Sequence, residues 1–255
     1  MHGPELRPEL RLEQTSELPT DLTAPDPLFD RLVGGARHHV TGKEGQRMHW
    51  AEWGPRDAPV LVMLHGAYGS WPHFLRNIET FATNHRVLIP DLPGYGKSDM
   101  PGVASIAGIG QAVARDITEL IGDASYRLFG FSFGGAVAGR LMLCHRARLS
   151  HVMLAAPAGI ANASSPPMKG VRGKQGPELI KALGFNLRSI MFARDESITP
   201  QAIAIQHRVS LAARLRVERV DWGDGLAEPV TGFPGHLSVI WGTGDSFIKS
   251  AELPK

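Results

Sequence analysis

One short stretch, residues 126–135 (YRLFGFSFGG), constrains the fold more than any other part of the sequence. Its apolar start is typical of a buried strand, and Ser132 follows between Gly130 and Gly134. A serine at the tip of a tight strand-to-helix turn sits in strained backbone, and side chains two positions before or after it would clash. Glycine at both positions removes the clash. The spacing therefore predicts a nucleophile elbow, although a glycine-rich turn that merely contains a serine would share the pattern.

The residues after this turn, 136–143, are small and apolar and are expected to form a helix whose N-terminus points at Ser132. The free N–H groups and the dipole of such a helix favour negative charge that develops near the serine. Cys144 follows this stretch and is the single cysteine of the chain. It excludes an internal disulfide, and we expect it to be a buried thiol of the core.

Apolar runs and amphipathic stretches alternate along most of the chain. A continuous apolar run such as residues 60–64 is typical of a strand that is covered on both faces of a parallel sheet. The expected strands are 36–41, 46–53, 60–64, 86–90, 126–129, 151–155 and 237–241, and helices are expected at 71–82 and 106–121. This alternation predicts an α/β fold with a mostly parallel, doubly wound sheet.

The alternation stops between residues 160 and 234, where helical segments are expected near 177–193 and 199–217. An insertion of this kind between two strands indicates a helical cap over the carboxyl edge of the sheet. The resulting organisation is a flexible N-terminal arm at 1–33, core at 34–159, cap at 160–234 and core again at 235–255. Apolar cap residues could line a pocket or simply form the cap's own core: Met168, Leu179, Ile180, Leu187, Ile190, Met191 and Phe192.

Composition narrows the classes of partner. Lys and Arg number 27 against 25 Asp and Glu, and this near-balance gives no signal for nucleic acid or a membrane surface. There is no apolar run of about 18 residues and no signal-peptide pattern, so we expect a soluble, cytoplasmic chain with a small-molecule substrate. No metal-ligand spacing stands out, and no cofactor is expected. Gly96-Lys97-Ser98 does not complete a phosphate-binding loop, because Asp91 stands where that loop needs glycine. The oligomeric state stays open.

Four motifs occur in a familiar order: His65-Gly66 after a strand, the DLPGYGKS loop at 91–98, the elbow at 130–135, and WGTGD at 241–245. Over residues 36–250 the sequence resembles the α/β-hydrolase fold family, in particular its capped serine hydrolases. The resemblance implies that Ser132 is the nucleophile, Asp245 the acid of a catalytic triad, and the N–H groups of Ala67 and Phe133 the oxyanion hole. It also implies structural roles beside the site for His65, Gly66, Gly130 and Gly134.

The family places its catalytic histidine after the acid and one further strand. All 11 histidines of this chain precede Asp245. We expect His236 to begin the last strand at the opposite end of the sheet from the site. We do not expect His207 in the cap to replace the catalytic histidine. We therefore expect a truncated hydrolase that lacks its last strand and its general base, which leaves residues 237–241 as an unpaired apolar edge.

The resemblance favours hydrolysis of a small-molecule ester through an acyl-enzyme. A serine nucleophile argues against dehalogenases and epoxide hydrolases of this fold, which need a carboxylate. Hydrolases that cleave carbon–carbon bonds in ring-cleavage products are an alternative, with Arg188 or Arg208 binding the substrate's acid group. Their turn usually reads differently from Ala67-Tyr68-Gly69-Ser70. A non-catalytic ligand binder on the same scaffold is the alternative of another class.

Overall fold

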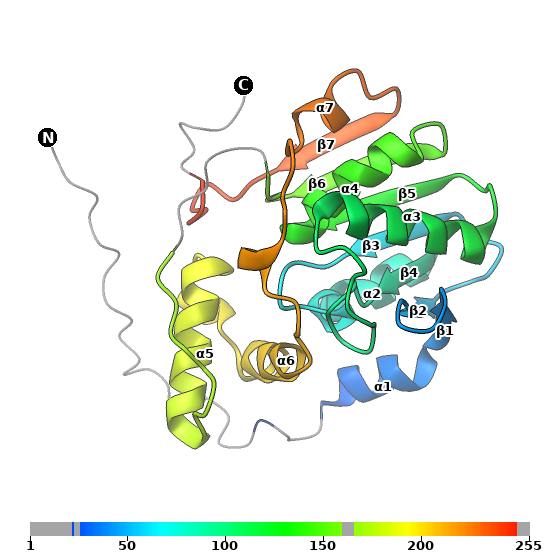
Figure 1. Cartoon of the computed structure of the whole chain (residues 1–255). Helices are drawn as coiled ribbons and strands as arrows, with labels where there is room; N and C mark the ends of the chain where they lie inside the picture. Colours follow the sequence, from blue (N-terminus) through cyan, green and yellow to red (C-terminus); the bar gives the residue numbers. More distant parts are fainter. Residues whose placement is uncertain (1–21, 23–25, 160–165, 249–255) are drawn as a thin grey trace, which may run out of the picture.

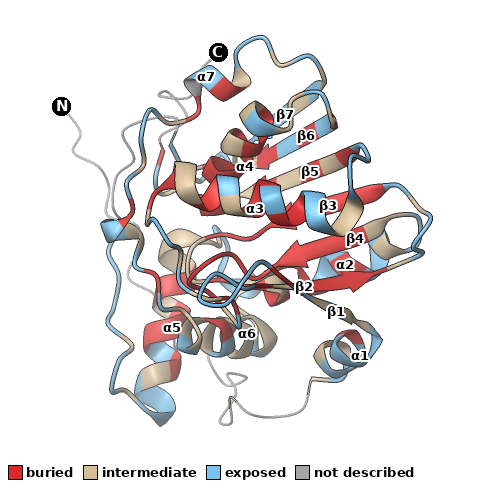
Figure 2. Cartoon of the chain, turned by 45° about the vertical axis from the view of Figure 1, so that its right-hand side comes forward, coloured by how far each residue is buried: buried red, intermediate tan, exposed pale blue. Residues whose placement is uncertain are grey.

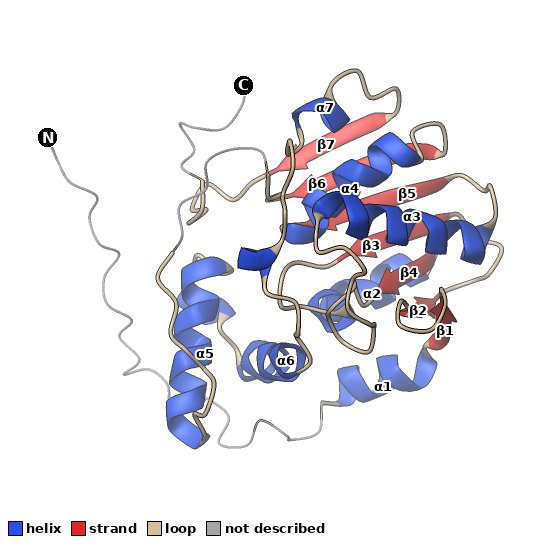
Figure 3. Cartoon of the chain, viewed as in Figure 1, coloured by secondary structure: helices blue, strands red, loops and turns tan. Residues whose placement is uncertain are grey.

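A computed structural model describes residues 22, 26–159 and 166–248 of the chain. A seven-stranded sheet crosses the molecule in the order β1-β2-β4-β3-β5-β6-β7 (Figures 1 and 3). Its strands are β1 (Arg37–Thr41), β2 (Met48–Trp53), β3 (Val60–Leu64), β4 (Arg86–Pro90), β5 (Tyr126–Phe131), β6 (Leu149–Ala155) and β7 (His236–Ile240). The pairs β1·β2 and β2·β4 are antiparallel, and every pairing from β4 to β7 is parallel. The predicted α/β fold with a mostly parallel sheet is confirmed.

Helices cover both faces of the sheet, as the continuous apolar strands require. On β3, Val62 and Leu64 join one buried cluster with residues of α3 (Ile106–Ile121) and α4 (Phe133–Cys144). Leu61 and Met63 point the other way, into a cluster with α1 (Pro27–Gly35) and α2 (Leu75–Ala82). Figure 2 shows this burial concentrated in the central strands. Because side chains alternate along a strand, the apolar run of β3 feeds two cores at once.

The N-terminal arm is shorter than the sequence indicates. Residues 27–33 belong to α1, which begins where the Asp26 carboxylate accepts the N–H groups of Leu28 and Phe29 at 3.0 and 3.1 Å. Leu32 is buried, and its carbonyl accepts the indole N–H of Trp53 at 2.9 Å. The prediction of a flexible arm through residue 33 is therefore wrong for this helix. Residues 1–21 and 23–25 of the expected arm lie outside the described residues.

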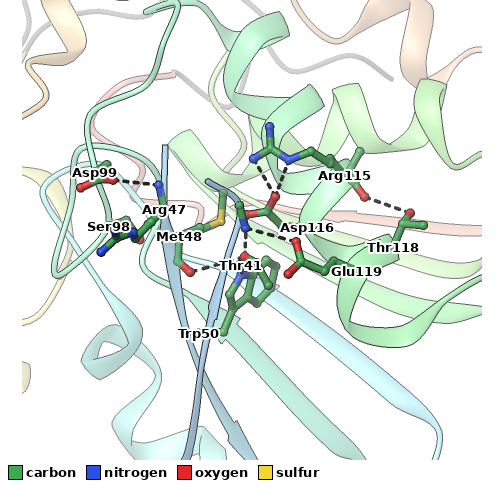
Figure 4. Close-up of polar contacts among 12 residues, drawn as sticks. Thr41, Arg47, Met48, Trp50, Ser98, Asp99, Arg115, Asp116, Thr118 and Glu119 are labelled. Carbon is green, nitrogen blue, oxygen red and sulfur yellow. Dashed lines mark hydrogen bonds and ion pairs between the residues drawn. The ribbon is translucent and has the colours of Figure 1, made fainter. Parts of the chain in front are cut away.

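A buried polar network fastens the β1–β2 hairpin to α3 (Figure 4). The Thr41 hydroxyl donates to the Asp116 carboxylate at 2.6 Å and accepts the Trp50 indole N–H at 2.9 Å. Asp116 is fully buried, and burial raises the pKa of its carboxyl group despite the adjacent Arg115 guanidinium. Farther along the hairpin, the Arg47 N–H donates to Asp99 at 2.8 Å. The hairpin thereby supports the loop that follows β4.

The segment expected to be a cap contains two longer helices: α5 (Gly176–Ile190) and α6 (Pro200–Leu211). They share an apolar cluster of their own that contains Ile180 and Leu187. Of the other proposed pocket residues, Leu179, Met191 and Phe192 pack partly buried against this cluster, while Met168 is 52% exposed. The helix α6 ends six residues earlier than predicted, because the chain turns so that the N–H groups of Arg214 and Leu215 donate to Gly94.

The segment from 160 to 234 also contains short turns of helix: η3 (Asp195–Ser197), η4 (Val217–Arg219) and α7 (Ala227–Val230). The helix α6 lies against the first half of the chain, where the Arg208 guanidinium stacks over the Phe29 ring at 4.0 Å and Gln201 donates to Asp26 at 3.0 Å. No helix among the described residues is long and apolar enough to cross a membrane. The expectation of a buried Cys144 is wrong: its position at the end of α4 leaves the thiol exposed.

Candidate active site

Ser132 lies at the junction of β5 and α4, where it is the residue before the first turn of the helix. Its φ is 52° and its ψ is −115°, a conformation that costs a residue with a side chain of the order of 1–3 kcal/mol. The Ser132 N–H donates to Ala155 at 3.0 Å, and the Ser132 carbonyl accepts the N–H of Ala158 at 3.0 Å. Neighbouring backbone thus holds the strained serine in place, and its side chain is only half buried.

The two glycines around Ser132 have no room for side chains. A methyl group on Gly130 would lie 2.7 Å from the Gly134 carbonyl oxygen and 2.9 Å from Ala138 Cβ. A methyl group on Gly134 would lie 2.3 Å from the Leu64 oxygen and 2.6 Å from the His65 oxygen. The sequence spacing predicts this steric requirement. Because Gly134 has no side chain, the first turn of α4 packs closely against the end of β3.

The turn after β3 comes next to the serine. A methyl group on Gly66 would lie 3.4 Å from Ser132 Cβ and 3.0 Å from the Phe131 ring. His65 is fully buried, with Nδ1 2.8 Å from the Gly66 carbonyl and Nε2 accepting the Leu92 N–H at 2.9 Å. Burial lowers the pKa of the imidazole to about 4, so it is neutral at pH 7. With both nitrogens occupied, His65 joins the turn to the loop after β4.

The expected oxyanion donors belong to these two adjoining turns. Phe133 is the first residue of α4, where an α-helix offers its N–H group no acceptor. Ala67 follows Gly66 and packs, partly buried, against the same apolar cluster as Phe133. The next residue, Tyr68, has a φ of 54°, so the chain is strained on this side of the site as well. Tyr68 donates its hydroxyl to Glu218 of η4 at 3.1 Å.

The loop at 91–98 is built around a buried carboxylate. Asp91 accepts the Lys97 N–H at 3.0 Å, and a methyl group on Gly96 would lie 2.2 Å from the same oxygen. Burial raises the pKa of Asp91, while the backbone N–H groups of Lys97 and Trp71 oppose the shift. Gly94, at a φ of 85°, accepts the N–H groups of Arg214 and Leu215 at 2.8 and 3.0 Å. The loop therefore connects the site to the chain that follows α6.

Asp245 lies beyond the carboxyl end of β7, at the same edge of the sheet as Ser132. Backbone hydrogen bonds step across this edge from Ser132 to Ala155, and then from Ala156 to Ile240 at 2.7 Å. One oxygen of the Asp245 carboxylate accepts the N–H groups of Phe247 and Ile248 at 2.8 and 3.0 Å. Within residues 26–159 and 166–248, no histidine is hydrogen-bonded to Asp245 or to the Ser132 hydroxyl.

Three histidines among the described residues are candidates for the general base. His236 starts β7, and its ring stacks on that of His151 at 4.7 Å, at the amino end of the strands and away from Ser132. His207 lies in α6, and burial lowers its pKa. His73, in η2 (Trp71–Phe74), was not singled out from the sequence; its ring is 6.2 Å from that of His65, and burial lowers its pKa to about 3. The sequence signal that could have identified His73 is its position just after the glycine turn.

Comparison with known proteins identifies the scaffold. The sequence matches the profile of the alpha/beta hydrolase family over residues 61–253. It is 34% identical over 138 residues to a 2-hydroxy-6-oxo-6-phenylhexa-2,4-dienoate hydrolase of Burkholderia cepacia, which covers 51% of this chain and 48% of that protein. The chain thus spans about half the length of that relative. A 2-hydroxy-6-oxononadienedioate/2-hydroxy-6-oxononatrienedioate hydrolase of Cupriavidus pinatubonensis is 26% identical over 84% of this chain and 81% of that protein.

Among solved structures, the naproxen esterase of Bacillus subtilis superposes with a TM-score of 0.66 at 18% identity. That superposition covers 89% of this chain and 85% of the esterase, and at this identity it supports the fold alone. The elbow and the His-Gly turn both lie within the residues that the family profile matches. The chain belongs to the alpha/beta hydrolase family.

Proposed function

We propose that this protein is a hydrolase that acts on a small-molecule ester through Ser132. The observation that carries the proposal is the strained Ser132 between two sterically required glycines, with the Gly66 turn directly beside it. In this mechanism the Ser132 oxygen attacks the ester carbonyl carbon and loses its proton to a base. The N–H groups of Ala67 and Phe133 stabilise the oxyanion, the alcohol leaves with a proton, and water then releases the acid.

The mechanism also requires a general base. Every histidine except His2 lies in a described part of the chain, and none of those is hydrogen-bonded to the Ser132 hydroxyl. We assign Asp245 as the acid that would orient an imidazole, since it follows the carboxyl end of β7. An oxyanion hole and a binding site without the triad base still give about 10³- to 10⁴-fold over water.

Carbon–carbon bond hydrolysis is the second candidate, because the Burkholderia cepacia relative carries the name of a hydrolase of a 2-hydroxy-6-oxodienoate. Such a substrate needs a cation for its acid group. The two cap arginines considered for this role already have partners: Arg188 donates to Asp195 at 2.6 Å, and Arg208 stacks over Phe29. These contacts favour the ester.

A fluorophosphonate probe tests the proposal, because its rate of reaction reports the nucleophilicity of a serine and it requires no knowledge of the substrate. Because no described histidine is bonded to Ser132, we expect slow formation of one probe adduct in the intact mass of the protein, faster labelling when imidazole is added as an external base, and no adduct on Ser132→Ala. Ser238→Ala, which removes an exposed serine of β7, is the matched control and should label like the wild type. A folded protein that forms no adduct with or without imidazole would refute the proposal and favour the non-catalytic ligand binder.

A further inference from the structure

Tyr95 is completely buried between the two turns that carry the proposed oxyanion donors. Its ring meets three other rings edge to face, at centroid distances of 5.5 Å to His65, 6.4 Å to Tyr68 and 6.0 Å to Phe133. His65 and Tyr68 flank Gly66 and Ala67 on one turn, and Phe133 begins α4 on the other. The Tyr95 ring therefore touches both turns at once.

The backbone around Tyr95 is held on several sides. The Tyr95 N–H donates to Leu92 at 2.9 Å, and the Tyr95 carbonyl accepts the Ser98 N–H at 3.1 Å. Leu92 in turn donates to His65, so the loop and the Gly66 turn are bonded to each other. A side chain on such a fixed loop occupies one place, and a ring there can set the distance between its neighbours.

The hydroxyl group of Tyr95 contributes little to this arrangement. Its oxygen is buried and makes no hydrogen bond of acceptable geometry among the described residues. Burial raises the pKa of the phenol. A buried hydroxyl without a partner is unfavourable, so any stabilisation that Tyr95 gives to its surroundings comes from its ring.

We propose that Tyr95 is a positioning residue, whose ring sets the separation between the Ala67 and Phe133 N–H groups. The inference rests on the proposed function of these two groups as an oxyanion hole. Donors of an oxyanion hole act through their distance to the developing charge, so a shift of about 1 Å can reduce the rate about 10²-fold. Trp222, 5.8 Å from Phe133, extends the same row of rings to the chain that follows α6.

The test compares Tyr95→Leu, which removes the ring, with Tyr95→Phe, which removes only the hydroxyl. Tyr126→Leu is the matched control, because Tyr126 is 2% exposed and lies at the opposite end of β5 from Ser132. Two quantities are measured: the rate of fluorophosphonate labelling of Ser132 at saturating probe, with the probe concentration that gives half of that rate, and the amide resonances of Ala67 and Phe133. Tyr95→Met replaces Tyr95→Leu if circular dichroism shows that the leucine variant does not fold.

We expect Tyr95→Leu to slow saturated labelling about 10²-fold with little change in the half-saturating concentration, and to shift both amide resonances. Tyr95→Phe should label like the wild type, and Tyr126→Leu should leave the two resonances in place. Equal losses in Tyr95→Phe and Tyr95→Leu would overturn the inference, because the hydroxyl would then act directly. Unchanged resonances in Tyr95→Leu would overturn it too. A wild type that is never labelled refutes the proposed function, while the resonances still test the role of Tyr95.

Discussion

The two sides of the candidate site are held in place by different means. Ser132 and the Gly66 turn lie at the ends of β5 and β3, and all five residues of β3 are buried. Asp245 follows β7, in which four of five residues are exposed and Leu237 is half buried. The serine side is thus fixed by packing of the core, whereas the acid side is fixed by backbone hydrogen bonds to β6 and by the turn around Asp245 itself.

This difference shows where the geometry of the site is secure. Around Ser132, the glycine contacts tie α4 to the end of β3 within the main core. Around Asp245, the carboxylate accepts two N–H groups of its own turn, so hydrogen bonds within that turn orient it. A change in packing should therefore affect the serine side strongly and the acid side weakly, and the predictions below test that contrast.

The largest difference in the loss of stability is expected between alanine substitutions of two isoleucines, one on β4 and one on β7. Ile89 of β4 is 0% exposed and Ile240 of β7 is 50% exposed. Ile89→Ala removes buried methylene groups and leaves a cavity, so the free energy of unfolding in urea should fall by about 3 kcal/mol. Ile240→Ala should change it by about 0.5 kcal/mol or less. Similar losses in both variants would show that β7 is packed as tightly as β4, against the contrast drawn here.

Acid should weaken the serine side through His65. Its pKa is about 4 in the folded protein and about 6.5 in the unfolded chain, so the unfolded state binds the proton first as pH falls. The stability that depends on neutral His65 is fully present above pH 6.5 and is lost between pH 6.5 and pH 4. Two and a half pKa units correspond to about 3 kcal/mol at most.

Urea unfolding between pH 7 and pH 4 measures this loss. His65→Gln should lower stability at pH 7 and make the dependence on pH less steep, while buried His73, whose pKa is lowered to about 3, should keep the rest of the dependence. His236→Gln, on the exposed strand β7, is the matched control and should keep the pH dependence of the wild type. A wild-type curve that is flat down to pH 4 would mean that protonation of His65 costs the fold nothing.

Sequence patterns predict the strands and the elbow well because these features depend on local spacing. The apolar run of β3 and the glycines beside Ser132 each report a nearby physical requirement: burial on both faces, or absence of room for a methyl group. The helix α1 was missed because its surroundings in the sequence are rich in proline and acidic residues. Its burial depends on the apolar cluster around Trp53 and on the hydrogen bond from the Trp53 indole, which only the folded sheet provides.

Contacts between side chains that are distant in the sequence could not be predicted either. Tyr95 belongs to the 91–98 motif and His73 follows the glycine turn, but their contacts with His65 come from loops after different strands, which no spacing reveals. Cys144 shows the opposite error, since its helical position suggests burial but it ends α4 beyond the packed part. Local pattern therefore identifies the elements that present a site, and tertiary packing decides which residues surround it.

The smallest expected difference concerns two glycines, one on each side of the site. In Gly134→Ala the new methyl group would meet the Leu64 and His65 carbonyl oxygens, so α4 must shift and the free energy of unfolding should fall by about 2 kcal/mol. Gly242, between β7 and Asp245, has no atom within 4 Å of an added methyl group, and Gly242→Ala should stay within about 0.5 kcal/mol of the wild type. The shift of α4 also moves the Phe133 N–H, so Gly134→Ala should slow the labelling of Ser132 more than its loss of stability alone explains, whereas Gly242→Ala should not. Normal labelling by a folded Gly134→Ala protein would show that the close contact at this glycine holds the helix without setting the geometry of the serine.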